Sequence, residues 1–141
     1  MQILGLDIGD KTVGVAKSDP LGYTAQPMTT IRYTQSAQAC KKLAQIIAEY
    51  SITRVIAGLP LNMNGTEGPQ AKKVRAFVDG IRQASKRMNL AVEFEFWDER
   101  MSTMGAERSL IEADVSRAKR KQVIDKMAAV FILQGYLDSL K

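Results

Sequence analysis

The chain contains no histidine and a single cysteine. This scarcity excludes the usual zinc sites, which are built from His and Cys, and leaves metals that prefer oxygen ligands. The lack of histidine also removes the commonest general base and every Ser-His or Cys-His nucleophile pair. Any hydrolytic chemistry in this protein must therefore depend on carboxylates and metal ions.

Long apolar segments are also missing. No run approaches the ~20 residues that span a bilayer, so we expect no membrane partner. Met1-Gln2-Ile3 begins a predicted strand and lacks the basic segment and apolar stretch of a signal peptide. With 141 residues, 45% of them hydrophobic and 25% charged, we expect one globular domain over residues 1–141 in the cytoplasm. Cys40 cannot form an internal disulfide, and its place in a helical pattern favours a buried thiol.

Positive charge is in excess and is clustered. The 20 Lys and Arg residues outnumber the 15 Asp and Glu residues, for a net charge of +5. Cations occupy four of the five positions in one segment: Arg117, Lys119, Arg120 and Lys121. In the first turns of a helix they would oppose the positive end of the helix dipole, and nucleic-acid phosphates would compensate them; an extended loop there would weaken this argument. A second stripe on a predicted helix has a simpler interpretation as a solvated face: Lys72, Arg75, Arg82 and Lys86.

Hydrophobic periodicity predicts a fold of the α/β class. Strands are expected at 3–6, 12–16, about 25–33, 54–58 and 92–97, and helices at about 39–50, 74–88, 102–112 and 117–139. Short turns make the first three strands antiparallel, whereas helical crossovers make the later two parallel to the first. The result is a five-stranded mixed sheet flanked by helices. Pro27 indicates an interruption or an exposed edge in the third strand, and the last strand alternates as expected near a sheet edge.

Asp7 is the first candidate site residue. It follows the apolar strand Ile3-Leu4-Gly5-Leu6 and precedes the tight turn Ile8-Gly9-Asp10-Lys11. A carboxylate at the end of a core strand is costly to bury without a partner, which predicts a cation, a hydrogen-bond network or a metal. The alternative is an Asp that merely accepts hydrogen bonds from turn amides. Asp7 taken alone does not decide between them.

Two further acids follow the last predicted strand, in Trp97-Asp98-Glu99-Arg100. The carboxyl ends of parallel strands meet at one rim, so at least one of these acids should lie near Asp7. Strict alternation would place Asp98 on the side of Phe96 and Glu99 on the side of Trp97. Because the strand ends here, the choice of metal ligand between them stays open. Either acid could instead pair with Arg100 or cap the next helix.

Asp125 is the third candidate. It lies in the segment 122–133, which is apolar nearly all round and must be buried. Ala128 and Ala129 lack bulk and would let this helix approach the sheet, bringing Asp125 towards the strand rim. The alternative is an acid near a helix start, favoured by the dipole and paired with Lys121 or Lys126.

Together, three acids without histidine and with a basic cluster beside one of them suggest a divalent-metal phosphodiesterase. Carboxylates suit Mg²⁺ or Mn²⁺, and two such ions ~4 Å apart can activate water and stabilise a leaving oxygen. No protein base is then required.

Four segments stand out in chain order: Asp7-Ile-Gly-Asp-Lys-Thr-Val-Gly-Val-Ala16, Gly58-Leu-Pro-Leu-Asn-Met-Asn-Gly65, Trp97-Asp-Glu-Arg-Met-Ser-Thr103 and Ala113-Asp-Val-Ser-Arg-Ala-Lys-Arg-Lys-Gln-Val-Ile-Asp-Lys-Met-Ala-Ala129. Together they resemble the YqgF/RuvX family, whose members are described as Holliday junction resolvases or pre-16S rRNA nucleases. The resemblance implies an RNase H-like fold, a bacterial cytoplasmic setting and a metal-dependent nuclease that matures the 5′ end of the 16S rRNA precursor.

Carried over to matching positions, the resemblance makes Asp7, Glu99 and Asp125 the metal-binding catalytic carboxylates, with Asp98 as a further metal candidate. It also implies substrate contacts by four residues: Lys11, Asn62, Arg100 and Lys121. One departure from the wider RNase H-like group concerns the fourth strand, which ends in Gly58-Leu59-Pro60 without an acid. Glu99, from the next strand, must substitute.

Other functions remain open at this point. The protein could be a Holliday junction resolvase acting on branched DNA, or a non-catalytic RNA-binding factor for ribosome assembly. Actin-like and sugar-kinase ATPases open with a similar Asp-x-Gly hairpin, but their architecture needs two such domains and a longer chain. RNA or DNA as substrate, endonuclease or exonuclease mode, one metal or two, and monomer or homodimer are not distinguished by these residues.

Overall fold

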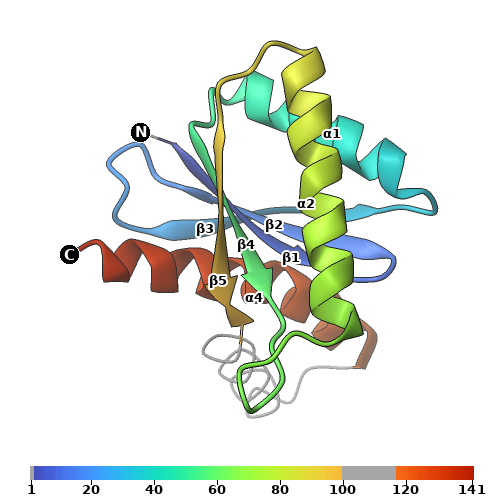
Figure 1. The fold of residues 1–141 in the computed structure, drawn as a ribbon. Helices are drawn as coiled ribbons and strands as arrows, with labels where there is room; N and C mark the ends of the chain where they lie inside the picture. The colour runs from blue at the N-terminus through green and yellow to red at the C-terminus, as the bar shows by residue number, and fades with distance from the viewer. Residues whose placement is uncertain (1, 100–116) are drawn as a thin grey trace.

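A twisted five-stranded sheet runs through the centre of the protein, with helices on both faces (Figure 1). The computed structural model describes the backbone of residues 2–99 and 117–141 and the side chains of 2–99 and 127–141. In chain order the elements are β1 (Ile3–Ile8), β2 (Thr12–Ser18), β3 (Ala25–Arg32), α1 (Ser36–Glu49), β4 (Arg54–Leu59), α2 (Pro69–Arg87), β5 (Glu93–Asp98) and α4 (Arg117–Ser139).

The strand order across the sheet is β3-β2-β1-β4-β5. β2 pairs antiparallel with both β1 and β3, while β4 pairs parallel with both β1 and β5. The predicted mixed sheet is therefore confirmed. The carboxyl ends of β1, β4 and β5 lie at the same side of the sheet, which we call the carboxyl edge.

The two edge strands are those that the sequence predicted. Pro27, which cannot donate a backbone hydrogen bond, lies in edge strand β3 opposite Ala16, where the register shifts between Val15 and Ala16. β5 forms the other edge, beyond β4. Its alternation of glutamates with Phe94 and Phe96 fits one exposed face.

The first strand is longer than predicted. β1 continues to Ile8, which pairs with Val13, so Asp7 lies within the strand opposite Gly14 rather than at the strand end. The antiparallel hairpin with β2 explains the extension, because its ladder runs up to the turn. The last helix, α4, begins and ends where expected, whereas the helix predicted at 102–112 lies outside the described residues.

Each face of the sheet carries its own hydrophobic core. On one face, β-strand residues such as Leu4, Leu6 and Val55 pack with the inner faces of α1 and α2. On the other face, Ile3 and Ile56 pack with α4 residues that are almost completely buried: Ala129, Ile132, Leu133, Tyr136 and Leu137. Successive strand residues alternate between these two cores. Within the described ranges, the structure has no helix long and apolar enough to cross a bilayer.

Candidate active site

Asp7 lies on the α4 face of the sheet. Ile3 belongs to the α4 core, and a Cβ built on Gly5 would meet Leu133 Cβ at 2.6 Å. Asp7 is the next residue of β1 on the same side, and it is half-buried. The turn that follows is held by two hydrogen bonds to Gly9: its N–H donates to the Thr12 carbonyl at 2.8 Å, and its carbonyl accepts from the Tyr33 hydroxyl at 2.6 Å. The backbone carrying Asp7 is thus anchored on both sides.

The structure separates Asp98 from Glu99, which the sequence left open. Phe96 packs on the α1/α2 core and Trp97 on the α4 core. Asp98 is the last residue of β5 and by alternation shares the side of Phe96. Glu99 follows the strand, and its Oε2 lies 3.4 Å from the position that a Cβ on Gly58 would take. Glu99 therefore shares the α4 side with Asp7, whereas Asp98 does not.

Gly58 supplies the space between the two acids. The parallel register pairs Leu6 with Ala57, so Gly58 is the next neighbour of Asp7, about 4.8 Å away across the strands. The position of its missing Cβ is approached by Glu99 Oε2 and, at 2.5 Å, by Ile132 Cδ1. A side chain there would force the end of Ile132 to move and would take up the space beside the Glu99 carboxylate. Sequence reasoning treated Gly58 as a missing acid, whereas the structure makes it the gap that admits the acid of the next strand.

The direction of α4 bears on the third acid. Ala129 O lies 3.0 Å from the Cβ position of Gly5, and Tyr136, two turns later, accepts a hydrogen bond from Arg54 at the start of β4. The helix therefore runs against β1, with its amino end towards the carboxyl edge (Figure 1). Asp125 precedes Ala129 by one helical turn. Its side chain lies outside the described part, so its presence at the site remains a prediction.

The structure describes the side chains of only two of the nucleic-acid-binding candidates. Lys11, in the β1–β2 turn, and Asn62, in the loop after β4, are both exposed. The basic segment forms the first turns of α4, a helix rather than an extended loop, as predicted. The side chains of its four cations, Arg117, Lys119, Arg120 and Lys121, lie beyond the described side chains, as does the whole of Arg100.

The donor set is compatible with a hard divalent cation. Asp7 and Glu99 offer carboxylate oxygens, which Mg²⁺ and Mn²⁺ prefer. Among side chains 2–99 and 127–141, no group of three or more His, Cys, Asp and Glu residues could hold a metal ion. A third carboxylate at this site would have to come from a side chain that is not described. Asp125 is the candidate for it.

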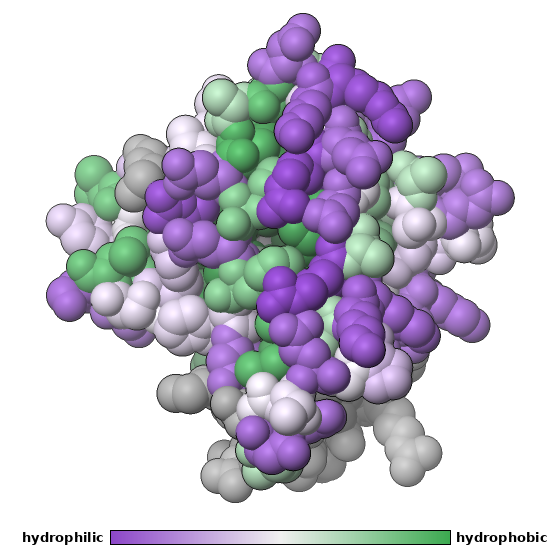
Figure 2. Space-filling model, in the orientation of Figure 1, coloured by the Kyte–Doolittle hydropathy of each residue, from purple (hydrophilic) through white to green (hydrophobic). Residues whose placement is uncertain are grey.

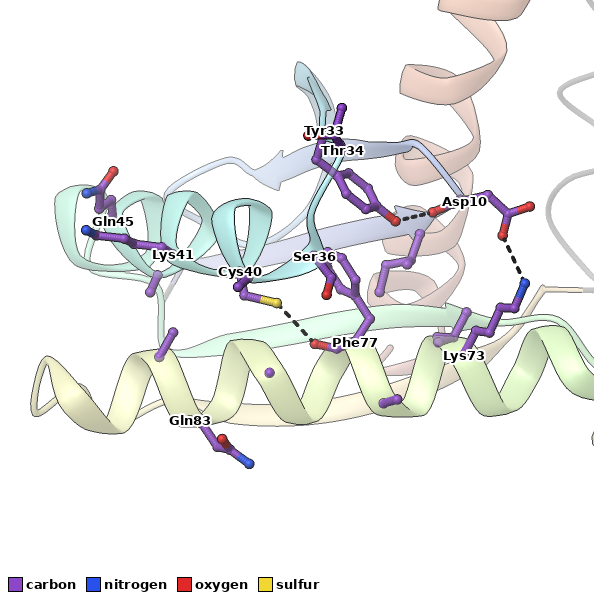
Figure 3. Close-up of a pocket in the computed structure, with 18 of the residues that line it drawn as sticks. Asp10, Tyr33, Thr34, Ser36, Cys40, Lys41, Gln45, Lys73, Phe77 and Gln83 are labelled. Carbon is purple, nitrogen blue, oxygen red and sulfur yellow. Dashed lines mark hydrogen bonds and ion pairs between the residues drawn. The ribbon is translucent and has the colours of Figure 1, made fainter.

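A groove that the sequence did not indicate lies on the opposite face, between α1 and α2 (Figure 3). Its volume is about 1140 Å³, and neither Asp7 nor Glu99 lines it. At one end Lys73 Nζ lies 3.8 Å from Asp10 Oδ1. On its floor the buried Cys40 thiol donates to the Phe77 carbonyl, and burial raises the pKa of Cys40 to about 11. The buried thiol expected from the sequence is confirmed.

The charged stripe on α2 is more than the solvated face that we predicted. The Arg75 guanidinium lies 4.7 Å from the ring centre of Phe96, and that of Arg82 lies 5.2 Å from the ring centre of Phe94. Figure 2 shows hydrophilic residues following α2 beside a hydrophobic strip. The two arginines cover the aromatic side chains of edge strand β5, which a helix-periodicity argument cannot detect because it ignores the neighbouring strand.

Comparison with known proteins places the chain. A family model described as RuvX, Holliday junction resolvase, matches residues 1–139. The chain belongs to the RuvX family. A relative from Desulforamulus reducens, named "Putative pre-16S rRNA nuclease", is 55% identical over 139 residues, which cover 99% of this chain and 98% of the relative. A Clostridium botulinum relative of the same name is 52% identical over 140 residues, with the same shares covered.

Solved structures agree on the fold. Thermus thermophilus RuvC in complex with a Holliday junction substrate matches with a TM-score of 0.65 at 11% identity, covering 99% of this chain and 96% of RuvC. The fowlpox virus resolvase in complex with Holliday junction DNA matches with a TM-score of 0.60 at 15% identity, covering 99% of both chains. At such identities the likeness concerns the fold alone. The RNase H-like fold of this RuvX-family protein is thereby confirmed.

Proposed function

We propose that this RuvX-family protein is a metal-dependent nuclease that hydrolyses phosphodiester bonds during 5′-end maturation of the 16S rRNA precursor. It would act in the cytoplasm, as a single domain over residues 1–141. The observation that carries the proposal is the position of the Glu99 carboxylate beside Gly58, which lies on the strand next to that of Asp7 and on the same sheet face. The relatives named as pre-16S rRNA nucleases support rRNA as the substrate.

In this proposal Asp7, Glu99 and Asp125 hold Mg²⁺ or Mn²⁺. When bound, such ions supply an activated water molecule and neutralise charge on the transferred phosphate. The chain itself holds the two acids in place: Asp7 is paired with Gly14 near the end of β1, and Glu99 follows an edge strand whose Trp97 packs on the α4 core. Asp98 is left out of the ligand set because it belongs to the other side of β5.

The proposed substrate contacts surround this edge. Lys11 and Asn62 belong to loops that follow β1 and β4, the two central strands ending there. Arg100, next to Glu99, and the cations at the start of α4 would contact phosphates of the same strand. Loops at the carboxyl ends of parallel strands are where α/β proteins usually bind ligands, which supports this assignment.

A second candidate is Holliday junction resolution. It is favoured by the description of the family model and by the fold shared with resolvases that were solved with junction DNA. A symmetric cut across a junction would need two copies of the chain. The oligomeric state, monomer or homodimer, therefore becomes an observable that separates the candidates.

The deciding experiment incubates purified protein with end-labelled 16S rRNA precursor and with a four-way DNA junction, in Mn²⁺, Mg²⁺ or EDTA. We expect cleavage of the precursor near the mature 5′ end, dependence on the metal, and loss of about a hundredfold to a thousandfold of the rate in Asp7→Asn and Glu99→Gln. Asp98→Asn is the matched control, one residue away on the other side of β5, and should stay within about threefold of the parent.

The possible outcomes separate the candidate functions. Junction cleavage by a dimer, with no cut in the precursor, would favour the resolvase. A parent protein that cuts neither substrate, and whose affinity for precursor RNA is unchanged by Asp7→Asn, would be the non-catalytic assembly factor. Full activity in EDTA would exclude the metal mechanism.

A further inference from the structure

The loop after β4, residues 61–67, has a tightly determined conformation. Leu61 and Glu67 form a bridge at its base. Within it, Asn62 N–H donates to the Thr66 carbonyl at 2.9 Å, and Gly65 N–H donates to the Asn62 carbonyl at 2.8 Å. Thr66 N–H also donates to Asn64 Oδ1 at 3.1 Å. A loop closed in this way moves as one unit, so whatever holds its base also sets where Asn62 lies.

The base of the loop is held by Arg75 of α2. Its guanidinium donates two hydrogen bonds to the Glu67 carboxylate, Nε to Oε1 at 2.6 Å and Nη2 to Oε2 at 2.8 Å. This is the forked arrangement that arginine, unlike lysine, can make with a carboxylate. The same guanidinium lies over the Phe96 ring, with 4.7 Å between its carbon and the ring centre. Arg75 therefore joins the loop to β5.

The position of Phe96 in β5 shows which part of the strand Arg75 holds. Phe96 pairs with Ala57 in the register between β4 and β5, and the next pair is Trp97 with Gly58. Phe96 faces α2, whereas Glu99 and the Gly58 gap lie on the α4 face, so Arg75 holds the opposite side of the same strand end. Leu59, the last residue of β4 before the loop, pairs with Asp98, the last residue of β5.

We propose that Arg75 is a positioning residue, which fixes the 61–67 loop relative to the strand that delivers Glu99, so that the loop meets the nucleic-acid strand held at the acids. This inference rests on the proposed nuclease function for its effect on cleavage. Arg75 has no role in the chemical step. Its action is to hold the substrate-facing loop in register with the acid pair.

The chain contains a matched control in Arg82, two helical turns further along α2. Arg82 pairs with Asp79 at 2.6 Å and lies 5.2 Å from the ring centre of Phe94. Its side chain is 41% exposed, against 47% for that of Arg75. Like Arg75, it belongs to α2, lies over an aromatic ring of β5 and pairs with a carboxylate, but it makes one hydrogen bond to that carboxylate, which lies on α2 itself and not in the loop.

The first test needs no catalysis. Amide hydrogen exchange is measured at Asn62, Gly65 and Thr66 in the parent, Arg75→Gln and Arg82→Gln. We expect exchange at these amides to rise about tenfold or more in Arg75→Gln and to stay near the parental rate in Arg82→Gln. Arg75→Lys keeps the charge without the fork and should fall between them. Unchanged exchange in Arg75→Gln would overturn the proposal.

The second test measures cleavage and RNA affinity for the same variants, with and without Asn62→Ala. We expect kcat/KM to fall about tenfold in Arg75→Gln and less than twofold in Arg82→Gln. If Arg75 acts through the loop, it should have little further effect once Asn62 is replaced. Equal losses in the two arginine variants, or full additivity with Asn62→Ala, would point to a general structural effect and overturn the proposal.

The two tests also separate failure of this inference from failure of the proposed function. If the parent protein cuts neither substrate, the nuclease proposal fails, while exchange and RNA affinity still decide on Arg75. In that case we expect Arg75→Gln to weaken RNA binding more than Arg82→Gln does. Equal RNA affinity of the two variants would contradict the role proposed for Arg75. If the parent cuts RNA and the loop loosens without any loss of kcat/KM, the inference fails alone.

Discussion

The helices pack on the two faces of the sheet in different ways. On the α4 face, glycines at positions 5 and 58 let one helix come close: Leu133 Cβ and Ile132 Cδ1 occupy the places where strand Cβ atoms would otherwise be. On the α1/α2 face, large aliphatic strand residues meet two helices, and a groove of about 1140 Å³ opens between those helices.

The difference shows that the α4 face needs exact placement of its atoms more than the α1/α2 face does. Close approach of α4 is needed if a carboxylate from the end of the chain is to meet one from its beginning, and glycine is the residue that permits such approach. The other face stabilises the fold by burying apolar side chains, a task that tolerates more variation in shape. We therefore expect substitutions on the α4 face to affect activity more than equivalent ones on the other face.

The largest expected effect concerns Asp125. Asp125→Asn should lower the cleavage rate by about a thousandfold, because an amide cannot replace an anionic metal ligand. Asp138→Asn, in the same helix, is the control: Asp138 is exposed and accepts a hydrogen bond from Gln134 at 3.0 Å. Rates are measured with Mn²⁺ on end-labelled precursor. Persistent cutting by Asp125→Asn would remove α4 from the mechanism.

Gly5→Ala should be the most destabilising small substitution. Its new methyl would lie 2.6 Å from Leu133 Cβ and 3.0 Å from the Ala129 carbonyl oxygen, neither of which can rotate away. We expect a loss of about 3 kcal/mol in the free energy of unfolding, measured by urea titration.

Gly80→Ala on the α1/α2 face is the counterpart to Gly5→Ala. The nearest atom there is Cys40 Sγ, at 2.8 Å, and the next is Cys40 Cβ, at 3.8 Å. Adding Cys40→Ala should therefore restore most of the stability lost in Gly80→Ala. If Gly5→Ala costs no more than Gly80→Ala, the contrast between the faces does not hold.

Gly58→Ala should separate activity from stability. The methyl would clash with the end of Ile132 at 2.5 Å and touch Glu99 Oε2 at 3.4 Å. We expect cleavage to fall about thirtyfold, or about 2 kcal/mol, because the methyl fills the space beside the Glu99 carboxylate in which a metal ion and its water would lie. Ile132→Val removes the closest carbon, so the double variant should regain thermal stability while its rate stays low. Recovery of both together would mean that Gly58 serves packing alone.

The smallest effect is a pH dependence of stability from the α1/α2 face. Burial raises the pKa of Cys40 from 9.0 to about 11, so the folded state retains the thiol proton at pH values where the unfolded chain has lost it. This contribution is complete below pH 9 and is lost as the pH rises towards 11. Between pH 8 and 10 it amounts to about 1 kcal/mol. Urea titrations of the parent and Cys40→Ala should show a shallower decline in the variant; equal slopes would contradict the assignment.

Much of the fold could be predicted from periodicity and turn lengths. The strand pattern, the short hairpins and the crossovers give one mixed sheet, and Pro27 marks an edge because it cannot complete a ladder. Local patterns identified the exposed face of α2 but missed a contact that comes from elsewhere in the chain. Arg75 looked like part of a solvated helix face because Phe96, on which it rests, is remote in sequence.

The candidate site divides in the same way. Asp7 stood out because a carboxylate in an apolar strand is costly, and Asp125 because the segment around it is apolar. The choice between Asp98 and Glu99 needed the sheet, since a carboxylate after the last strand residue can turn to either side. Asp125 stays a prediction from the sequence, because its side chain lies outside the described residues.

By itself, the sequence determined which chemistry is available: no histidine, one thiol, and a small set of acids in apolar surroundings, which are properties of composition and local pattern. Tertiary structure alone decided that the Glu99 carboxylate lies beside Gly58 on the face of the sheet that carries Asp7, and that Arg75 ties the 61–67 loop to β5. The reason is physical. Distances between side chains on different strands depend on register and on the approach of neighbouring elements, and no local stretch of chain carries that information.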